Sequence, residues 1–173
     1  MTAVALTPGQ HRRRPTRMAI SFARTRRLPS GRIAPEGAIQ VTRARHSINA
    51  CLRACQLPDS FIGDFDLVVS ELVTNALDYG AGAEINLRLT CTFDEVRLEV
   101  EDGSRNAPCL QTPTSDSESG RGLFIVEALT KEYSGSWGTS NNNTTTWCSL
   151  SPYEGSDAIM TPASTPTLGQ VDP

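Results

Sequence analysis

Two segments of the chain alternate apolar and polar residues, and they restrict the possible folds more than any other feature. Within 84–91 and again within 96–101, apolar residues stand at every second position. Side chains of a strand point alternately to the two faces of a sheet, so each segment has one buried face and one wet face. The pattern predicts an antiparallel hairpin with Asp94 near its turn, covered on one face only.

The segments before this hairpin have helical periodicity. The first predicted helix begins near Pro35, a residue favoured in the first helical turn, and stops before Pro58. The second begins at Asp59 or Ser60, either of which can cap it, and ends at Gly80. A third helix and two late strands are expected over 122–132, 136–139 and 144–151. These elements favour an α+β fold: a two-layer sandwich with a mixed, mostly antiparallel sheet and helices on one face.

Composition divides the chain into three parts. Residues 1–34 are rich in Arg, Pro, Ser and Gly and are predicted to be a disordered basic leader, to which Met18 to Ala23 could add a short edge strand. Residues 152–173 contain four prolines among Gly, Ser and Thr and are expected to be a disordered tail. The folded domain is therefore predicted over 35–151.

The charge is uneven as well. Residues 1–60 hold eleven arginines against two acidic residues, although the whole chain has a net charge of −3. A basic arm can bind nucleic acid, and deletion of 1–34 would test that function. The acidic remainder and a low aromatic content of 6% argue against a surface on which bases could stack, so a nucleic-acid partner is not expected.

Several other classes of protein are disfavoured. The five cysteines form no C-x-x-C pair, so free thiols are expected rather than a zinc site or a disulfide framework. His11 and His46 have no Ser or Cys partner in a pattern typical of a hydrolase triad. No apolar run is long enough to span a membrane, and no signal peptide is visible, so a cytoplasmic location without a membrane partner is predicted.

The second helix carries a candidate catalytic pair. Glu71 and Asn75 are four residues apart and therefore lie on one face of the helix. An Asn amide oxygen is a suitable hard ligand for Mg²⁺, and a Glu one turn away can accept a proton. The alternative interpretation is a narrow solvent-facing stripe on an amphipathic helix.

A carboxylate stands at an unexpected place after the second strand. The alternation that buries Val96, Leu98 and Val100 would next turn Asp102 toward the helix side of the sheet, where an unpaired charge is costly. One interpretation is an acceptor for a buried donor such as an exocyclic amine, with Gly103 leaving room for close approach. The other is that the strand has already ended in an Asp-Gly turn.

Two glycines come directly before the third helix. Gly120 and Gly122 flank Arg121 at its start, where free N–H groups and the helix dipole favour an anion such as phosphate. Glycines also simply end loops, so this signal is weak alone. The segment is neither a P-loop nor a dinucleotide-binding fingerprint.

Taken in chain order, these three motifs resemble those of a known family. The N, G1 and G2 boxes of the GHKL ATPase superfamily are similar to E-L-V-T-N-A at 71–76, E-D-G at 101–103 and G-R-G-L at 120–123. Within it, V-V-S-E-L-V-T-N-A-L at 68–77 and the late S-W-G and T-T-W triplets most resemble small bacterial anti-sigma-factor serine kinases. The resemblance covers about Pro35 to Leu150 and implies a histidine kinase-like ATPase fold that binds ATP and Mg²⁺.

The resemblance implies a role for each matching residue. Asn75 would ligate Mg²⁺ and bridge the ATP phosphates, and Glu71 would be the general base. Asp102 would accept a hydrogen bond from the adenine amino group, and Gly103 would let the purine approach. The phosphates would contact Gly120, Arg121 and Gly122, and the adenine would lie beside Thr145.

The resemblance also implies partners. The expected function is a serine/threonine kinase that binds a sigma factor and phosphorylates an antagonist, the anti-anti-sigma protein, and a homodimer is suggested as well. The alternative is a non-catalytic ATP-binding module that sequesters a partner, which would need no base at Glu71. A histidine autokinase is disfavoured because His46 is followed by Ser47 rather than Glu. The chain departs from the family at 141–144, where three Asn and a Thr replace a small Gly-Lys pair.

Overall fold

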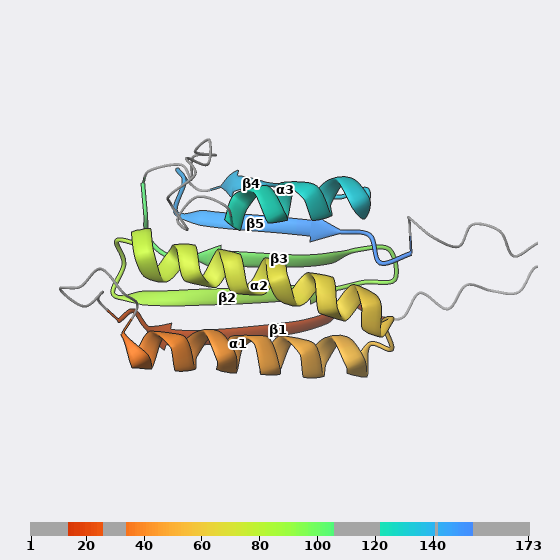
Figure 1. Ribbon diagram of the computed structural model, residues 1–173, viewed down its shortest axis with the longest axis horizontal. Coiled ribbons are helices and arrows are strands. Elements are labelled where there is room, and N and C mark those ends of the chain that lie inside the picture. Colours follow the sequence, from red (N-terminus) through yellow and green to blue (C-terminus); the bar gives the residue numbers. More distant parts are fainter. Residues whose placement is uncertain (1–13, 26–33, 106–121, 141, 154–173) are drawn as a thin grey trace, which may run out of the picture.

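The computed structural model describes residues 14–25, 34–105, 122–140 and 142–153. This part of the chain contains three helices and five strands (Figure 1). In chain order these elements are β1 (Thr16–Ala23), α1 (Pro35–Ala54), α2 (Asp59–Tyr79), β2 (Glu84–Cys91), β3 (Val96–Glu101), α3 (Gly122–Glu132), β4 (Ser136–Ser140) and β5 (Thr145–Leu150).

The strands form one sheet in the order β1-β2-β3-β5-β4, in which every described pairing is antiparallel. All three helices lie on one face of this sheet (Figure 1). The predicted α+β two-layer sandwich is therefore confirmed, with a sheet that is antiparallel throughout its described pairs. None of the helices in the described residues is long and apolar enough to cross a membrane.

The core lies between the helices and the sheet. The strands β2 and β3 bury alternate side chains against it, as their sequence pattern predicts. The middle helix α2 contributes the most to this layer, because apolar residues three and four apart bury one side of it along its length. Among the described cysteines, Cys51, Cys55, Cys91 and Cys148 are free thiols, in agreement with the expectation, and Cys109 lies outside the described residues.

The strand β1 enlarges the domain beyond the predicted boundary. Its eight residues all pair with β2, from Thr16↔Cys91 to Ala23↔Glu84, so part of the segment expected to be a leader belongs to the sheet. Met18, Ile20 and Phe22 alternate along it and pack against the core. The short edge strand expected over Met18 to Ala23 is therefore present and begins two residues earlier, at Thr16.

The two ends of α2 differ from expectation. The helix begins at Asp59, and the capping position is occupied by Pro58 with no side-chain cap, so the prediction that Asp59 or Ser60 caps the helix is wrong. Asp59 instead adds a negative charge to the first turn, where the helix dipole favours it. The helix ends before Gly80 as expected, but Gly80 has φ −57°, which is not the left-handed conformation of a typical glycine stop.

An ion pair between an exposed arginine and a buried aspartate joins the first two helices. Arg45 and Asn49 of α1 both donate hydrogen bonds to the carboxylate of Asp66 on α2. Asp66 is only 8% exposed. Burial by itself would raise the pKa of Asp66, but the hydrogen bonds from Arg45 and Asn49 outweigh it and lower the pKa.

The hairpin between β2 and β3 lies at one end of the sheet, at the right of Figure 1. There Phe93 stacks on Tyr153 with ring centroids 5.3 Å apart. The opposite end of the sheet, at the left of Figure 1, gathers the end of α2, the end of β3 and the start of β5.

Candidate functional site

The candidate site lies at this second end of the sheet. Glu71 and Asn75 belong to the last turns of α2, and Asp102 and Gly103 follow β3 directly. Gly122 is the first residue of α3, and Thr145 is the first residue of β5. Gly120 and Arg121 lie outside the described residues, so their placement stays a prediction.

Glu71 lies against the start of α3. A Cβ atom added to Gly122 would clash with Oε2 of Glu71, so the absence of a side chain at Gly122 leaves the space that the carboxylate occupies. The first N–H groups of a helix have no partner within the helix, so an incoming anion finds hydrogen-bond donors at this place. Two motifs 51 residues apart in the sequence therefore meet in the fold.

Burial gives the Glu71 carboxylate a particular chemistry. Desolvation raises its pKa above the ordinary value, and no described residue donates a hydrogen bond to it. A carboxylate with a raised pKa is a better proton acceptor than a fully solvated one. Its position under Gly122 does not fit the alternative of a solvent-facing stripe.

Asn75 lies one helical turn after Glu71, on the same side of α2. It is half-buried and is followed by Ala76 and Leu77, which are in the core. The helix ends one turn later, at Tyr79, and the following Gly80 packs against Asp102.

Asp102 combines both of its predicted interpretations. The strand ends at Glu101, and Oδ1 of Asp102 accepts the N–H of Ser104 at 2.8 Å, which is the geometry of an Asp-Gly turn. Burial nevertheless raises the pKa of Asp102, against the opposing effects of that hydrogen bond and of the positive charge of Arg24. Asp102 thus forms the turn while its carboxylate stays partly buried.

Three glycines bring the chain between α2 and β2 onto the backbone at Asp102. A Cβ on Gly80 would clash with the carbonyl oxygen of Ala76 and would lie 3.0 Å from Cβ of Asp102. The N–H of Gly82 donates to the carbonyl oxygen of Asp102 at 2.7 Å. Gly103 has φ +68°, and a Cβ there would lie 2.9 Å from the nitrogen of Gly82. Contacts within the protein therefore suffice to explain Gly103, and its contact with a purine stays a prediction.

The structure places Thr145 on a different face from Asp102. Thr145 pairs with Glu101, whereas the next residue, Thr146, pairs with the core residue Val100. Directly paired residues share a face of the sheet, so the Thr145 side chain lies away from the helices. It is 3% exposed, and its Oγ1 has no hydrogen-bond partner within the described residues.

The residue that sequence reasoning missed is Thr144. Its carbonyl oxygen accepts the N–H of Asp102 at 3.0 Å, which continues the pairing of β3 with β5. The alternation of faces then puts the side chain of Thr144 on the same face as that of Asp102. The alternation of side chains along the late strand could have indicated Thr144, but only with the register between β3 and β5 known.

A comparison with known protein families identifies the domain. The sequence model of the histidine kinase-like ATPase domain matches residues 34–149. The chain belongs to this family. The search of the curated proteins found no match. The matched segment of this histidine kinase-like ATPase domain runs from the start of α1 almost to the end of β5 and leaves β1 outside.

The residues at the site fit ATP, which domains of this family bind, usually with Mg²⁺. The partly desolvated carboxylate of Asp102 suits an amine donor, and the amide oxygen of Asn75 is a hard ligand for a metal ion. No group of three or more His, Cys, Asp or Glu residues in the described part of the chain could hold a metal ion. Mg²⁺ is commonly bound through one or two side chains, phosphate oxygens and water, and therefore does not need such a group.

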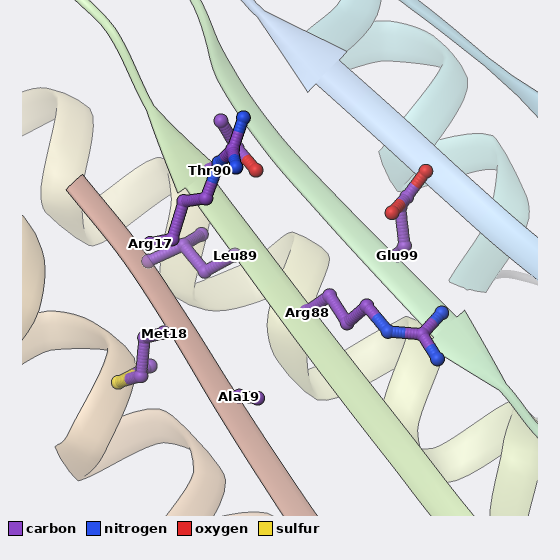
Figure 2. A pocket seen from close by; sticks show the side chains of 7 residues that line it. All are labelled: Arg17, Met18, Ala19, Arg88, Leu89, Thr90 and Glu99. Atoms are coloured by element: carbon purple, nitrogen blue, oxygen red, sulfur yellow. The ribbon is translucent and has the colours of Figure 1, made fainter. Parts of the chain in front are cut away.

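A shallow hollow of about 440 Å³ lies elsewhere, on the face of the sheet that no described helix covers (Figure 2). Arg17, Arg88 and Glu99 project around it from β1, β2 and β3. None of the predicted site residues lines this hollow, so it is separate from the candidate site.

Proposed function

We propose that this protein is an ATP-dependent serine/threonine kinase that acts as an anti-sigma factor. The observation that carries the proposal is the position of Glu71, whose desolvated carboxylate lies against Gly122 at the start of α3. A module that only binds ATP needs a metal ligand and an adenine acceptor, but it does not need a half-buried base beside the proposed phosphate-binding end of a helix. This is why catalysis is favoured over sequestration alone.

Each residue has a proposed task. Asn75 holds Mg²⁺ with its amide oxygen, and Asp102 accepts the adenine amino group beside Thr144 and Gly103. The N–H groups at the start of α3, with Gly120, Arg121 and Gly122, contact the phosphates. Bound Mg-ATP supplies the phosphoryl group, and Glu71 accepts the proton from the hydroxyl of the incoming serine. Thr145, which points away from Asp102, supports the strand rather than the adenine.

The proposed partners follow from the same resemblance. The substrate is a serine of an antagonist protein, the anti-anti-sigma protein, and the regulated partner is a sigma factor. We also propose a cytoplasmic location, because a regulator of transcription acts where its sigma factor is. The homodimer is proposed from the resemblance to the anti-sigma-factor kinases. Nucleic acid is not a proposed partner.

The test combines nucleotide binding with phosphotransfer. Wild-type protein should bind ATP more tightly with Mg²⁺ than without it and should phosphorylate a candidate antagonist protein. Glu71→Gln should keep its ATP affinity and lose about 10²–10⁴-fold in phosphotransfer, the usual contribution of a positioned base. Glu132→Gln, an exposed carboxylate at the far end of α3, is the matched control. ATP binding without any phosphotransfer would instead identify a non-catalytic binding module.

A further inference from the structure

Arg24 connects the N-terminal strand to the candidate site. It follows β1 directly, and its backbone N–H donates to the carbonyl oxygen of Ala83 at 2.9 Å. Its side chain reaches further along the same turn, where Nε donates to the carbonyl oxygen of Gly82 at 2.9 Å. Arg24 thus contacts the segment between α2 and β2, 58 residues away in the chain.

Gly82 is held between Arg24 and Asp102. Its carbonyl oxygen accepts from Arg24, and its N–H donates to the carbonyl oxygen of Asp102 at 2.7 Å. Cβ of any other residue at Gly82 would lie 3.0 Å from that same oxygen, so the two backbones are in close contact. A displacement of the Gly82 peptide is therefore transmitted directly to Asp102.

Arg24 also acts on Asp102 through its charge. Among the described residues, Arg24 is the charged side chain whose field favours the ionised form of the Asp102 carboxyl, and it opposes the larger effect of burial on the pKa. The guanidinium is therefore near enough to stabilise the acceptor electrostatically as well as through the Gly82 peptide.

We infer that Arg24 is a positioning residue for nucleotide recognition, which holds the Gly82 peptide against Asp102 and so fixes the carboxylate that receives the adenine amino group. This inference rests on the proposed function, and it adds a residue outside the segment that matches the family, 34–149. Arg24 does not touch the nucleotide; it acts through Gly82 and Asp102. The strand β1 is then part of the binding site and not only an addition to the sheet.

The test compares ATP with purine riboside 5′-triphosphate, which lacks the amino group on the ring. Arg24→Met should weaken ATP binding by about 3–10-fold, the range expected for one intramolecular hydrogen bond, and should leave binding of the analogue nearly unchanged. Arg24→Lys keeps the charge and should restore part of the ATP affinity. Arg17→Met is the matched control, since Arg17 is an exposed arginine of β1, and should change neither affinity.

A double-variant cycle completes the experiment. With Asp102→Asn in place, Arg24→Met should cause no further loss of ATP affinity, because the residue through which it acts has been altered. Equal losses for ATP and the analogue, or an additive loss in the double variant, would overturn the inference while the proposed ATP binding stands. Wild-type protein that binds neither nucleotide would instead overturn the proposed function.

Discussion

Gly122 is the position where one methyl group should affect the proposed chemistry most. The Cβ of an alanine there would occupy the space of the Glu71 carboxylate. The displaced atoms are the far end of a flexible side chain, so Gly122→Ala should change the free energy of unfolding by less than about 1 kcal/mol. A displacement of a catalytic group by about 1 Å can lower the reaction rate by up to about 10²-fold. The rate of phosphotransfer should therefore fall steeply. Urea unfolding and a phosphotransfer assay measure the two effects.

Gly63 provides the control for that substitution. It is an exposed glycine of α2, and a Cβ there would meet nothing within 4 Å. Gly63→Ala should stabilise the protein by about 0.5–1 kcal/mol through helix propensity and leave phosphotransfer unchanged. If Gly122→Ala behaved like Gly63→Ala in both assays, the catalytic position of Glu71 would be wrong.

Asp102 should determine which purine is bound. Asp102→Asn replaces a charged acceptor by a neutral one and should lower ATP affinity about ten- to a hundred-fold, the worth of a charge-assisted hydrogen bond. Affinity for GTP, which offers a carbonyl at the same ring position, should fall less. Isothermal calorimetry with both nucleotides makes this measurement, and an unchanged ATP affinity in a folded variant would refute the adenine assignment.

The raised pKa of Glu71 has a consequence for stability. Because burial raises the pKa of this carboxyl in the folded protein above its unfolded value of about 4.3, the charged form opposes folding. The protonated carboxyl of Glu71 therefore contributes to the free energy of unfolding at low pH, and this contribution is lost as pH rises through the raised pKa. Glu71→Gln should unfold at a higher denaturant concentration than wild type at pH 7, and the difference should shrink toward pH 4. The same difference at both pH values would contradict a desolvated carboxylate.

At the scale of helices, the ion pair between α1 and α2 should affect stability with a pH dependence opposite to that of Glu71. The pKa of Asp66 is lowered, so the pair stabilises the fold above about pH 4, and this contribution is lost as pH falls through the lowered value. Arg45→Met should cost about 1–2 kcal/mol at pH 7, a range reduced for the partial exposure of Arg45, and less near pH 3. Denaturant unfolding at the two pH values tests this. Arg43→Met, an exposed arginine of the same helix, should change little.

For the whole molecule, β1 is expected to be needed for a monodisperse protein. Deletion of residues 1–25 removes eight strand pairs and leaves the edge of β2 open. An open edge pairs readily with another chain, so the shortened protein should be less stable and should self-associate. Light scattering and thermal unfolding measure both properties. Deletion of 1–13 keeps β1 and is the control; identical behaviour of the two deletions would show that β1 contributes nothing.

Local patterns predicted much of this molecule, and contacts between distant segments account for what they missed. The alternation in 84–91 and 96–101 predicted the buried faces of β2 and β3, and helical spacing predicted α1, α2 and α3 closely. The same alternation pointed to Asp102. Thr144, by contrast, depends on the register between β3 and β5, which no single strand contains.

Contacts between distant segments also explain two features around the glycines that follow α2. Gly80 has the position of an ordinary helix stop, yet its backbone is not left-handed, and its small size is required by the carbonyl oxygen of Ala76 and by Asp102, 22 residues later. Likewise, the hydrogen bond of Arg24 with Gly82 spans 58 residues. The amino-acid composition gave no indication of this hydrogen bond, because Arg24 lies in the arginine-rich region 1–34, for which a disordered leader is predicted.

The stacked pair of Phe93 and Tyr153 offers a practical advantage. It lies at the end of the sheet opposite to Asp102, and a six-residue strand such as β3 separates the two ends by about 20 Å. A fluorophore or a surface linker attached beside Asp94 would therefore lie far from the proposed nucleotide site at Asp102. Such an attachment point would allow an immobilised or labelled protein to report binding without a reporter at the site itself.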